Sequence, residues 1–482
     1  MKILIFGSGS AVNIYIRDYR EFFLNNINIM AFVDNDKQKQ GCKFLEKDII
    51  SPDCICKFSF DLILICSVYE EEIFEQLIHN YGLSEKKIYT RRIFFEKIIF
   101  KYYDNKYDLY NKKILIVSED LGTDKDYKKY YGRYYDLFYI IGVISINDIN
   151  LIDNFIYDYL LITNFRPLTL QNKNYFEKYK MENKINKQKL LTIEILKVYF
   201  NKVKMLKSGG ESGNKYLVIR INLYFMGIGA IALMVAKGVA YAKKMGYIPV
   251  VDMETLETQY LEKGEYGNIN AYNKFFKQPR GVDMQDIKQS EQIAIMYGIN
   301  WYSKRDEKEL VLPEIQDELY DKFSMFKKKF YNKKVLGVLF RGTDYANVKP
   351  YGHNIQPDLN TMIQVVREKI VEWNGFDLIF LCTEVQEACK RFEDEFGKEK
   401  VCYYPQLRYK QDTKKYLAEI KLKAGERTEQ GKDYLIALNC LASCNSIVAG
   451  QTVGTKIALL LNNNKYQNSY LFTLGKYGVD SL

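Results

Sequence analysis

An arginine and an aspartate directly follow one of the most apolar segments of this 482-residue chain. The segment is Val335–Phe340, and Arg341-Gly-Thr-Asp344 comes next. At the carboxyl end of a parallel strand, such side chains point into the crevice where α/β sheets bind ligands. A guanidinium at that place is suited to bidentate binding of a diphosphate. The plainer alternative is an ion pair between Arg341 and Asp344 that orders the turn.

A second segment combines backbone donors with hydroxyl groups. Ser446–Ala449 is predicted to be a strand, and the turn Gly450–Thr455 leads from it into an apolar helix. A turn rich in Gly and Thr at a helix N-terminus forms an anion cradle from N–H groups, hydroxyls and the helix dipole. Taken alone, the segment is equally well a capped helix. Because it belongs to the same predicted α/β half as Arg341, the two favour one joint site.

The N-terminus contains a third candidate, Gly7-Ser-Gly9, which lies between a predicted strand and a predicted helix. Two glycines permit close approach of a pyrophosphate, and Asp34, at the end of the next strand, could bind a ribose hydroxyl. Val12 stands where the dinucleotide fingerprint has its third glycine. A nucleotide site for an NAD-like ligand at Gly7, Gly9 and Asp34 is therefore an alternative to a structural turn. Ala31–Asp36 resembles the N-terminal Rossmann-like domains that are attached to bacterial sugar-modifying enzymes.

Residues 215–482 resemble the fucosyltransferase superfamily, which includes the α-1,2- and α-1,6-fucosyltransferases and the protein O-fucosyltransferases. Arg341–Asp344 is similar to the arginine-containing first motif, and Ser443–Thr452 to the late motif of helix, strand and Ser/Thr turn. The order and spacing of the similar segments agree with the family. The other similar segments are Gly227-Ile-Gly229 with its helix, Ile248–Asp252, Phe275–Pro279 and Gly352–Pro357.

The resemblance implies a GT-B fold and an inverting, metal-independent transfer of a sugar from a nucleoside-diphosphate donor to a glycan hydroxyl. GDP-fucose is the favoured donor, and no cofactor is required. Arg341 would hold the donor β-phosphate and stabilise the leaving diphosphate, where negative charge accumulates. By the same resemblance Gly227 and Gly229 would form a loop of the acceptor half. The implied donor-binding residues are Arg341, Asp433, Gly450, Thr452, Gly454 and Thr455.

Two positions depart from the family pattern. The family often has a histidine two residues before the arginine, where it contacts guanine, and this chain has Leu339 there. Asp433, the nearest match to the helical acid that reads guanine, lies about one turn earlier than a direct alignment would place it. GDP and fucose therefore follow less directly from the sequence than the transferase class does.

An inverting transferase also needs a group that takes the proton of the acceptor hydroxyl. Asp344, His353 and Glu384 follow or flank strands of the predicted donor half. His353 titrates near neutrality, but a loop histidine is more often a hydrogen-bonding group. Asp344 could instead orient Arg341. The sequence leaves these three candidates for the catalytic base open.

The elements that must position these residues form an α/β pattern along the whole chain. Short apolar runs alternate with helical stretches, which is typical of parallel, doubly wound sheets. We predict an α/β chain in which a GT-B-like pair of Rossmann-like halves is preceded by one or two smaller Rossmann-like units. The smaller units are inferred from two series of apolar strands, at 2–6, 29–33 and 62–66 and at 113–117, 139–143 and 159–163.

The chain changes character near residue 214. Lys207–Asn214 is rich in glycine and serine, which is typical of a linker, and six of the eight prolines follow it. The polar segment 168–203 predicts long connecting helices, and 253–333 is predicted to be largely helical. The predicted parts are a Rossmann-like domain (1–105), a second small α/β unit with connecting helices (106–206), a linker (207–214), an acceptor half (215–333) and a donor half (334–482).

Composition excludes several classes of protein. With 47% hydrophobic and 27% charged residues, the chain is neither disordered nor fibrous. A formal charge of +10 without an arginine-rich tract does not indicate nucleic acid. The cysteines form no C-x-x-C pair, so the sequence predicts no zinc site and favours the reducing cytoplasm. The longest uncharged apolar run, 223–236, is too short to cross a bilayer, which leaves only peripheral association with the inner membrane face.

Three functions follow from these features. The favoured one is a cytoplasmic bacterial glycosyltransferase, fucosyltransferase-like, acting on a glycan acceptor, free or lipid-linked, in surface polysaccharide synthesis. The second is an NAD-dependent nucleotide-sugar-modifying enzyme centred on Gly7, against which stand the missing third glycine and the absence of a catalytic signature. The third is a non-catalytic nucleotide- or glycan-binding protein, an alternative that Leu339 keeps open.

Overall fold

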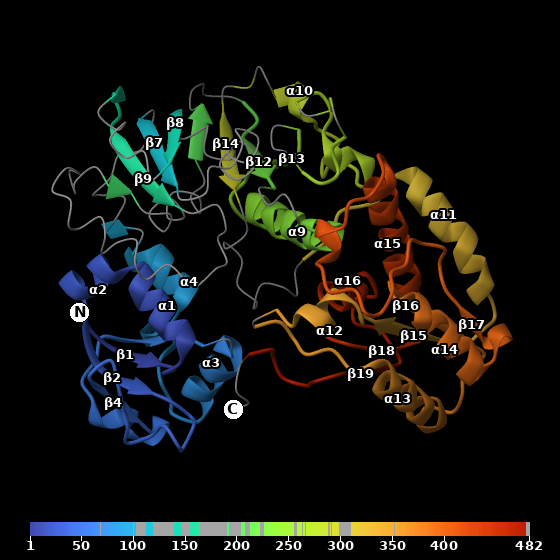
Figure 1. The fold of residues 1–482 in the computed structure, drawn as a ribbon, viewed down its shortest axis with the longest axis horizontal. Coiled ribbons are helices and arrows are strands. Elements are labelled where there is room, and N and C mark those ends of the chain that lie inside the picture. Colours follow the sequence, from blue (N-terminus) through green and yellow to red (C-terminus); the bar gives the residue numbers. More distant parts are fainter. Residues whose placement is uncertain are drawn as a thin grey trace. The chain divides into compact units, whose positions relative to one another are not determined.

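The computed structural model of the chain divides into two compact units, Met1–Phe200 and Asn201–Ser481. Two α/β sheets lie in each unit (Figure 1). The structure describes residues 1–67, 69–99, 101–102, 112–118, 139–145, 154–163, 190–191, 204–207, 213–221, 226–254, 258–262, 264–265, 267–287, 290, 292–297, 310–350 and 352–478.

The first sheet of the first unit has two short apolar segments at its centre, Lys2–Phe6 and Leu62–Ile65, that are buried on both faces. Such runs are typical of parallel strands covered by helices. The strands are β1 (Lys2–Phe6), β2 (Asn28–Val33), β3 (Lys43–Phe44), β4 (Lys47–Ile50), β5 (Leu62–Ile65) and β6 (Ile88–Thr90). Their order is β3-β4-β2-β1-β5-β6, and the pairs are parallel except that of β3 with β4.

Helices follow the strands of this first sheet along the chain. The single helix predicted after Gly9 is two helices, α1 and α2. The helices are α1 (Ser10–Asp18), α2 (Arg20–Asn26), α3 (Glu70–His79) and α4 (Arg91–Phe94), with shorter helical turns at Pro52–Lys57, Glu85–Lys87 and Phe95–Ile99.

The second sheet of this unit confirms the predicted repeat of three strands. It contains β7 (Lys113–Ser118), β8 (Tyr139–Ser145), β9 (Tyr159–Thr163) and β10 (Leu190–Leu191). All pairs are parallel, in the order β10-β9-β7-β8. The predicted connecting helices at 168–203 lie outside the described residues except for 190–191, which form the strand β10 and not a helix.

The first sheet of the second unit corrects one prediction. Among the described residues of 253–333, Ile293–Tyr297 forms strand β14 in the interior of the sheet, and helices or helical turns cover only Ala271–Lys274, Met284–Ile287 and Asp317–Phe330. A short apolar run reads alike as a buried strand or a helix, and pairing with β12 decides it here. The strands are β11 (Lys204–Lys207), β12 (Tyr216–Arg220), β13 (Ile248–Asp252) and β14, in the order β11-β14-β12-β13, with β11 antiparallel to β14.

Strand β11 also bears on the predicted linker at 207–214. Because β11 pairs with β14, residues 204–207 belong to the sheet of the second unit. Residues 208–212 of the linker lie outside the described part of the chain. The helices of this half are α9 (Ile228–Lys244), α10 (Met284–Ile287) and α11 (Asp317–Lys327), with shorter turns at Ala271–Lys274 and Lys328–Phe330.

The last sheet is entirely parallel and has the order β17-β16-β15-β18-β19. Helices α13 and α14 cover one face, and α15 and α16 cover the other. The strands are β15 (Val335–Phe340), β16 (Leu378–Thr383), β17 (Val401–Cys402), β18 (Ser446–Ala449) and β19 (Asn468–Leu471). The helices are α12 (Asp344–Val348), α13 (Leu359–Glu372), α14 (Gln386–Phe396), α15 (Glu426–Ala442) and α16 (Val453–Leu461), with short turns at Lys398–Lys400 and Leu417–Glu419.

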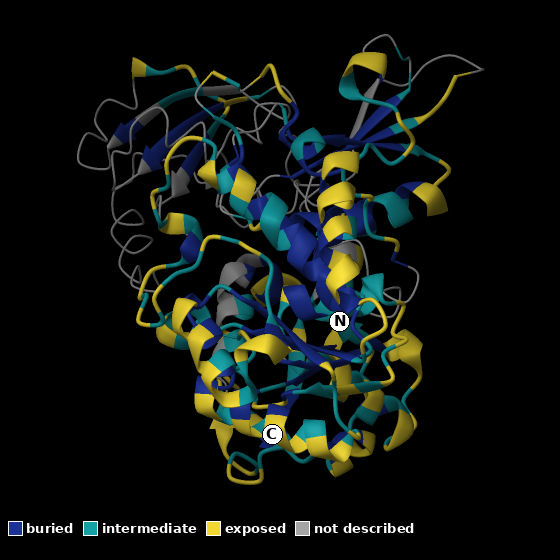
Figure 2. Ribbon diagram, turned by 90° about the vertical axis from the view of Figure 1, so that its right-hand side faces the viewer, coloured by how far each residue is buried: buried dark blue, intermediate teal, exposed yellow. Residues whose placement is uncertain are grey.

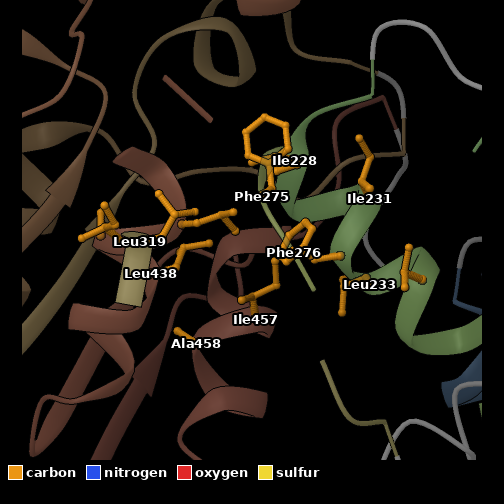
Figure 3. Close-up of a cluster of buried hydrophobic side chains, with 14 of the residues drawn as sticks. Ile228, Ile231, Leu233, Phe275, Phe276, Leu319, Leu438, Ile457 and Ala458 are labelled. Atoms are coloured by element: carbon orange, nitrogen blue, oxygen red, sulfur yellow. The ribbon is translucent and has the colours of Figure 1, made fainter. Parts of the chain in front are cut away.

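One hydrophobic cluster joins the two sheets of the second unit through α9, α15 and α16. Figure 3 shows side chains of α9, among them Ile228 and Ile231, gathered with Leu438 of α15 and Ile457 of α16. The strands are largely buried, while the helices expose their outer sides (Figure 2). The parallel α/β architecture predicted from the sequence is confirmed, and in the second unit its two sheets share one core.

Candidate functional site

Three neighbouring strands of the last sheet end at one edge, and a candidate residue follows each of them. Arg341 follows β15, Glu384 follows β16, and the turn Gly450–Gln451 follows β18. The register pairs Phe340 with Thr383 and Leu339 with Ala449, so the three strands end side by side. Because the carboxyl ends of parallel strands form the ligand crevice of such sheets, this edge is the candidate site.

The Arg341 guanidinium is held at this edge by two carboxylates. Its Nη2 donates to Asp344 Oδ1 at 2.9 Å and Oδ2 at 3.1 Å, and its Nε lies 3.6 Å from Glu384 Oε1. That Nε is buried and has no hydrogen-bond acceptor in the described part of the chain. Burial alone would lower the pKa of Arg341, but Glu384 and Asp344 together raise it above its ordinary value. The arginine therefore stays charged and keeps one buried donor unused.

Asp344 and Glu384 are both occupied by groups of the chain itself. Asp344 is 3% exposed and accepts hydrogen bonds from the backbone N–H groups of Tyr345 at 3.0 Å and Leu417 at 3.3 Å. Glu384 Oε1 accepts from Thr343 Oγ1 at 2.9 Å and Gly342 N at 3.1 Å. The ion pair offered as the plainer alternative is present, and these contacts fix the position of Arg341. The oxygens of both carboxylates are therefore already engaged by donors of the chain itself.

His353 lies next to this cluster through Tyr345. The ring centroids of His353 and Tyr345 are 5.1 Å apart in an edge-on contact. The guanidinium carbon of Arg341 lies over the same Tyr345 ring, 5.0 Å from its centroid. Desolvation of the packed part of the imidazole lowers the pKa of His353, and the Asp344 charge opposes that shift. His353, which is exposed, is therefore neutral at pH 7 and able to accept a proton.

The turn between β18 and α16 is a capped helix start. Thr452 Oγ1 accepts from Thr455 N at 3.2 Å, Thr452 N donates to Thr455 Oγ1 at 3.4 Å, and the Thr455 hydroxyl donates to the Gly450 carbonyl. The two hydroxyls thus serve the helix itself. The N–H groups of Val453 and Gly454, in the first turn, have no acceptor within the helix and are the donors that an anion could use.

Each glycine of this site has a distinct packing role. A Cβ at Gly450 would lie 2.1 Å from Gln356 Oε1, so the buried Gln356 side chain requires a glycine there. Gly227 is the N-cap of α9. A Cβ at Gly229 would lie 3.0 Å from Ile457 Cδ1, which shows how closely α9 approaches α16. Gly229 is therefore brought close to the start of α16, and a Cβ at Gly227 would meet open space.

Asp433 does not lie with the residues around Arg341. Burial raises its pKa to about 6, Glu429 adds to the shift, and Lys322 and Lys432 oppose it. These neighbours belong to α11 and to the face of α15 that packs on α11. The next residue, Tyr434, interacts electrostatically with Arg341 instead. The donor-binding role of Asp433 stays a prediction. The groups that act on Asp433 lie on α11 and α15, and one residue turns a helical side chain by about 100°, so Tyr434 has other neighbours.

Replacement of Asp433 by asparagine is expected to change the pH dependence of stability. The folded-state pKa of about 6 exceeds the unfolded value of about 3.9, so the native state binds the proton more tightly. This stabilising contribution is full below about pH 4 and is lost as the pH rises through about 6. The melting temperature of Asp433→Asn should exceed that of wild type by more at pH 7.5 than at pH 5. Asp412→Asn, at an exposed site, is the control, and an equal difference at both pH values would contradict the assignment.

The N-terminal loop Gly7–Ser8 is hydrogen-bonded to the Asp34 carboxylate. Ser8 N donates to Asp34 Oδ2 at 3.1 Å, the Ser8 hydroxyl donates to the same oxygen, and Asp36 N donates to Oδ1 at 3.0 Å. Gly7 has φ +114°, and a Cβ there would lie 2.6 Å from the Cys66 carbonyl oxygen, whereas Gly9 has open space. Gly7 is therefore required by the backbone conformation and by the close approach of the Cys66 carbonyl. The Asp34 carboxylate, which a ribose would need, already accepts hydrogen bonds from Ser8 and Asp36.

Sequence reasoning missed Thr343, Gln356 and Tyr434. Thr343 stands inside the Arg341–Asp344 motif, so the motif itself pointed to it. Tyr434 could have been found from the spacing of Arg427, Gln430 and Tyr434, which places the three on one face of α15. Gln356 lies within Gly352–Pro357, one of the segments similar to the family, but its contact with the turn after β18 depends on the approach of that loop, which the sequence does not show.

In comparisons with known proteins, one segment of the chain matches a family model. Residues 1–89 match a protein-family model described as C2185-like, N-terminal. No curated protein sequence matches the chain.

Several solved structures of fucosyltransferases are similar to the chain at low identity. The fucosyltransferase NodZ from Bradyrhizobium has a TM-score of 0.36 and 16% identity over 55% of this chain and 98% of that one. The NodZ α-1,6-fucosyltransferase co-crystallised with GDP has a TM-score of 0.35 and 16% identity over 52% and 93% of the two chains. POFUT1 in complex with GDP-fucose has a TM-score of 0.26 and 8% identity over 99% and 98%. Likeness at this level assigns neither a fold nor an activity to this chain.

No three His, Cys, Asp or Glu side chains in the described part of the chain converge as metal ligands. None of the helices in that part of the chain is both long enough and apolar enough to span a bilayer.

Proposed function

We propose that this chain is an inverting, metal-independent glycosyltransferase of the fucosyltransferase type, with a GT-B-like pair of halves in residues 215–333 and 334–482. The donor is a nucleoside-diphosphate sugar, with GDP-fucose favoured, and the acceptor is a glycan hydroxyl. One observation supports this above others. A charged arginine with an unused buried donor, Nε, lies at the carboxyl edge of a parallel sheet, where the neighbouring strand β18 leads into the N-terminus of α16.

The proposed reaction is a single displacement. The acceptor oxygen attacks the anomeric carbon, the bond from that carbon to the β-phosphate oxygen breaks, and the nucleoside diphosphate leaves with the electron pair. Attack from the face opposite the leaving group inverts the anomeric centre. Negative charge accumulates on the β-phosphate, where Arg341 and the first-turn N–H groups of Val453 and Gly454 would stabilise it. Thr452 and Thr455 hold that turn in place through the cap.

His353 is the proposed base for the acceptor proton. Of the three candidates it is exposed and neutral at pH 7, whereas Asp344 and Glu384 are engaged by Arg341 and by backbone N–H groups. Asp344 and Glu384 then act as positioning residues for Arg341. His353 is also joined to the arginine through the Tyr345 ring, which places it within the same cluster.

Neither Leu339 nor Asp433 is placed to read a guanine base. Leu339 is 4% exposed, and a Cβ at Gly454 would lie 3.2 Å from its Cδ1, so Leu339 packs against α16 and offers no polar contact to a base. Asp433 faces α11. Guanine recognition would therefore need groups other than these two, and GDP must be compared with the other nucleoside diphosphates.

The test is a thermal-shift panel of GDP, UDP, ADP, CDP, dTDP and NAD on the full chain, followed by transfer assays with the corresponding nucleotide sugars. At 100 times its dissociation constant, a ligand of the native state adds about 2.7 kcal/mol of stability. We expect a rise in melting temperature with one nucleoside diphosphate and none with NAD, because Asp34 is occupied by Ser8. If NAD alone stabilises the chain, or no nucleotide does, the proposal is wrong.

The proposed setting is the cytoplasm of a bacterium, in the synthesis of surface polysaccharide. Acceptors in such pathways include lipid-linked glycans, which would bring the chain to the inner face of the membrane. Residues 1–206 would then support the transferase half or bind the acceptor. Sedimentation of the full chain with acceptor-bearing vesicles, compared with vesicles lacking the acceptor, tests this setting.

A further inference from the structure

The side chain of Tyr434, on α15, lies where the first turns of α9 and α16 meet. A Cβ at Gly454 would lie 2.3 Å from Tyr434 Oη, and one at Gly229 would lie 3.6 Å from Tyr434 Cε1. Each glycine is the second residue of its helix. The ring thus packs against two helix N-termini at positions where each helix lacks a side chain, and the hydroxyl rests directly on the first turn of α16.

Tyr434 belongs to the same electrostatic environment as Arg341. Burial raises the pKa of Tyr434, while the charges of Arg341 and Glu384 act on it in opposite directions. Tyr434 in turn is one of the groups that act on the pKa of Arg341. The hydroxyl is therefore protonated at physiological pH and can donate a hydrogen bond.

The Tyr434 hydroxyl makes no hydrogen bond within the described part of the chain. It is not one of the fully buried side-chain atoms there that lack a partner, so a ligand can reach it. Two other tyrosines packed into the same hydrophobic cluster are paired: Tyr466 donates to the Leu441 carbonyl at 2.9 Å, and Tyr272 donates to the Lys277 carbonyl at 3.2 Å. A packed tyrosine hydroxyl usually finds a partner. An unpaired one beside an arginine and a helix N-terminus is ready to bind an acceptor brought by a ligand.

We infer that Tyr434 is a ligand-binding residue whose hydroxyl donates a hydrogen bond to a phosphate oxygen of a nucleoside diphosphate bound between Arg341 and the start of α16. This inference rests on the proposed function. Three donors from three elements then converge on the diphosphate: Arg341 Nε after β15, the first-turn N–H groups of α16, and Tyr434 Oη from α15. Because Gly229 packs on the same ring, the ligand is also linked to α9 of the other half.

Tyr434→Phe tests the inference, because it removes one oxygen and keeps the ring that packs in the core. Isothermal titration of the full chain with GDP, UDP, ADP, CDP and dTDP should show about tenfold weaker binding of the diphosphate that wild type binds, the effect of one hydrogen bond to a charged group. Tyr466→Phe is the matched control, since it makes the same change in the same cluster away from the site. That control should bind as wild type does.

The outcomes separate this inference from the proposed function. If wild type binds a diphosphate and Tyr434→Phe binds it equally well, the inference is wrong and the proposed function stands. If wild type binds none, both are wrong. The position of the hydroxyl is tested independently by Gly454→Ala, whose Cβ would collide with Oη. Gly454→Ala should lower the melting temperature by less in the Tyr434→Phe background than in wild type, and an equal loss in both backgrounds would overturn the inference.

Discussion

Replacing Arg341 with alanine is expected to lower the rate of sugar transfer by a factor of about 10²–10³. That is the usual effect of removing one preorganised donor from developing negative charge in a transition state. Arg341 is suited to the role because Asp344 and Glu384 hold its guanidinium in place while Nε remains unused. Steady-state rates with the nucleotide sugar identified by the thermal-shift panel measure the effect. The stabilisation of the chain by the diphosphate should disappear at the same time.

Two variants keep this prediction testable if Arg341→Ala is unstable. Arg341→Lys retains the charge but lacks the fixed fork of donors, so we expect a smaller loss of about tenfold. Arg367→Ala removes an exposed arginine on α13 that pairs with Glu395, and transfer should be unchanged. If folded Arg341→Ala or Arg341→Lys transfers sugar at the wild-type rate, Arg341 does not bind the donor.

The largest loss of stability is expected for Asp252→Ala. Asp252 is 0% exposed, and its Oδ2 accepts from Arg220 Nε at 2.6 Å, with the Arg220 side chain 9% exposed. Removing one partner of a buried ion pair costs about 3–5 kcal/mol, because the other charge stays in a low-dielectric environment. The pair joins the carboxyl ends of β12 and β13, which are neighbours in the sheet. Urea unfolding of the full chain measures the loss.

Hydrogen exchange locates the effect of Asp252→Ala. The backbone amides of β12 and β13 should lose protection, while those of β15 and β16 lose less. The Arg220–Asp252 pair lies on β12 and the edge strand β13, whereas β15 and β16 belong to the other sheet of the second unit. Glu395→Ala removes an exposed ion pair and should cost at most about 1 kcal/mol. A loss for Asp252→Ala no larger than that of Glu395→Ala would show that the buried pair contributes little.

The sequence by itself predicted three of the strands of the last sheet, those that precede Arg341, Glu384 and Gly450, together with these residues that follow them. Val335–Phe340 and Leu378–Thr383 are buried along their whole length, and such runs stand out because parallel strands covered on both faces admit almost no polar residue. Arg341 and Glu384 follow at the ends of these runs. Their meeting at one sheet edge is a consequence of parallel pairing, which the α/β pattern already implied.

Tertiary structure alone decided what the candidate side chains contact. Ile293–Tyr297 is a strand because β11 and β12 pair with it, although its apolar run is equally compatible with a helix. The Asp34 carboxylate is occupied because β1 and β2 pair side by side, which brings Ser8, after β1, to Asp34, after β2. The hydroxyl groups of Thr452 and Thr455 are already hydrogen-bonded in the cap of α16 and to the Gly450 carbonyl.

The difference between Asp433 and Tyr434 shows why the sequence could not predict which side chain of α15 faces Arg341. Both lie on α15, one residue apart, and the helix itself was predictable from its apolar pattern. Which of them faces Arg341 depends on how α15 is rotated about its axis, and that rotation is set by packing against α11, α9 and α16. Local sequence determines which segments are buried and where they end. Only the packing of those segments determines which of two adjacent side chains reaches the site.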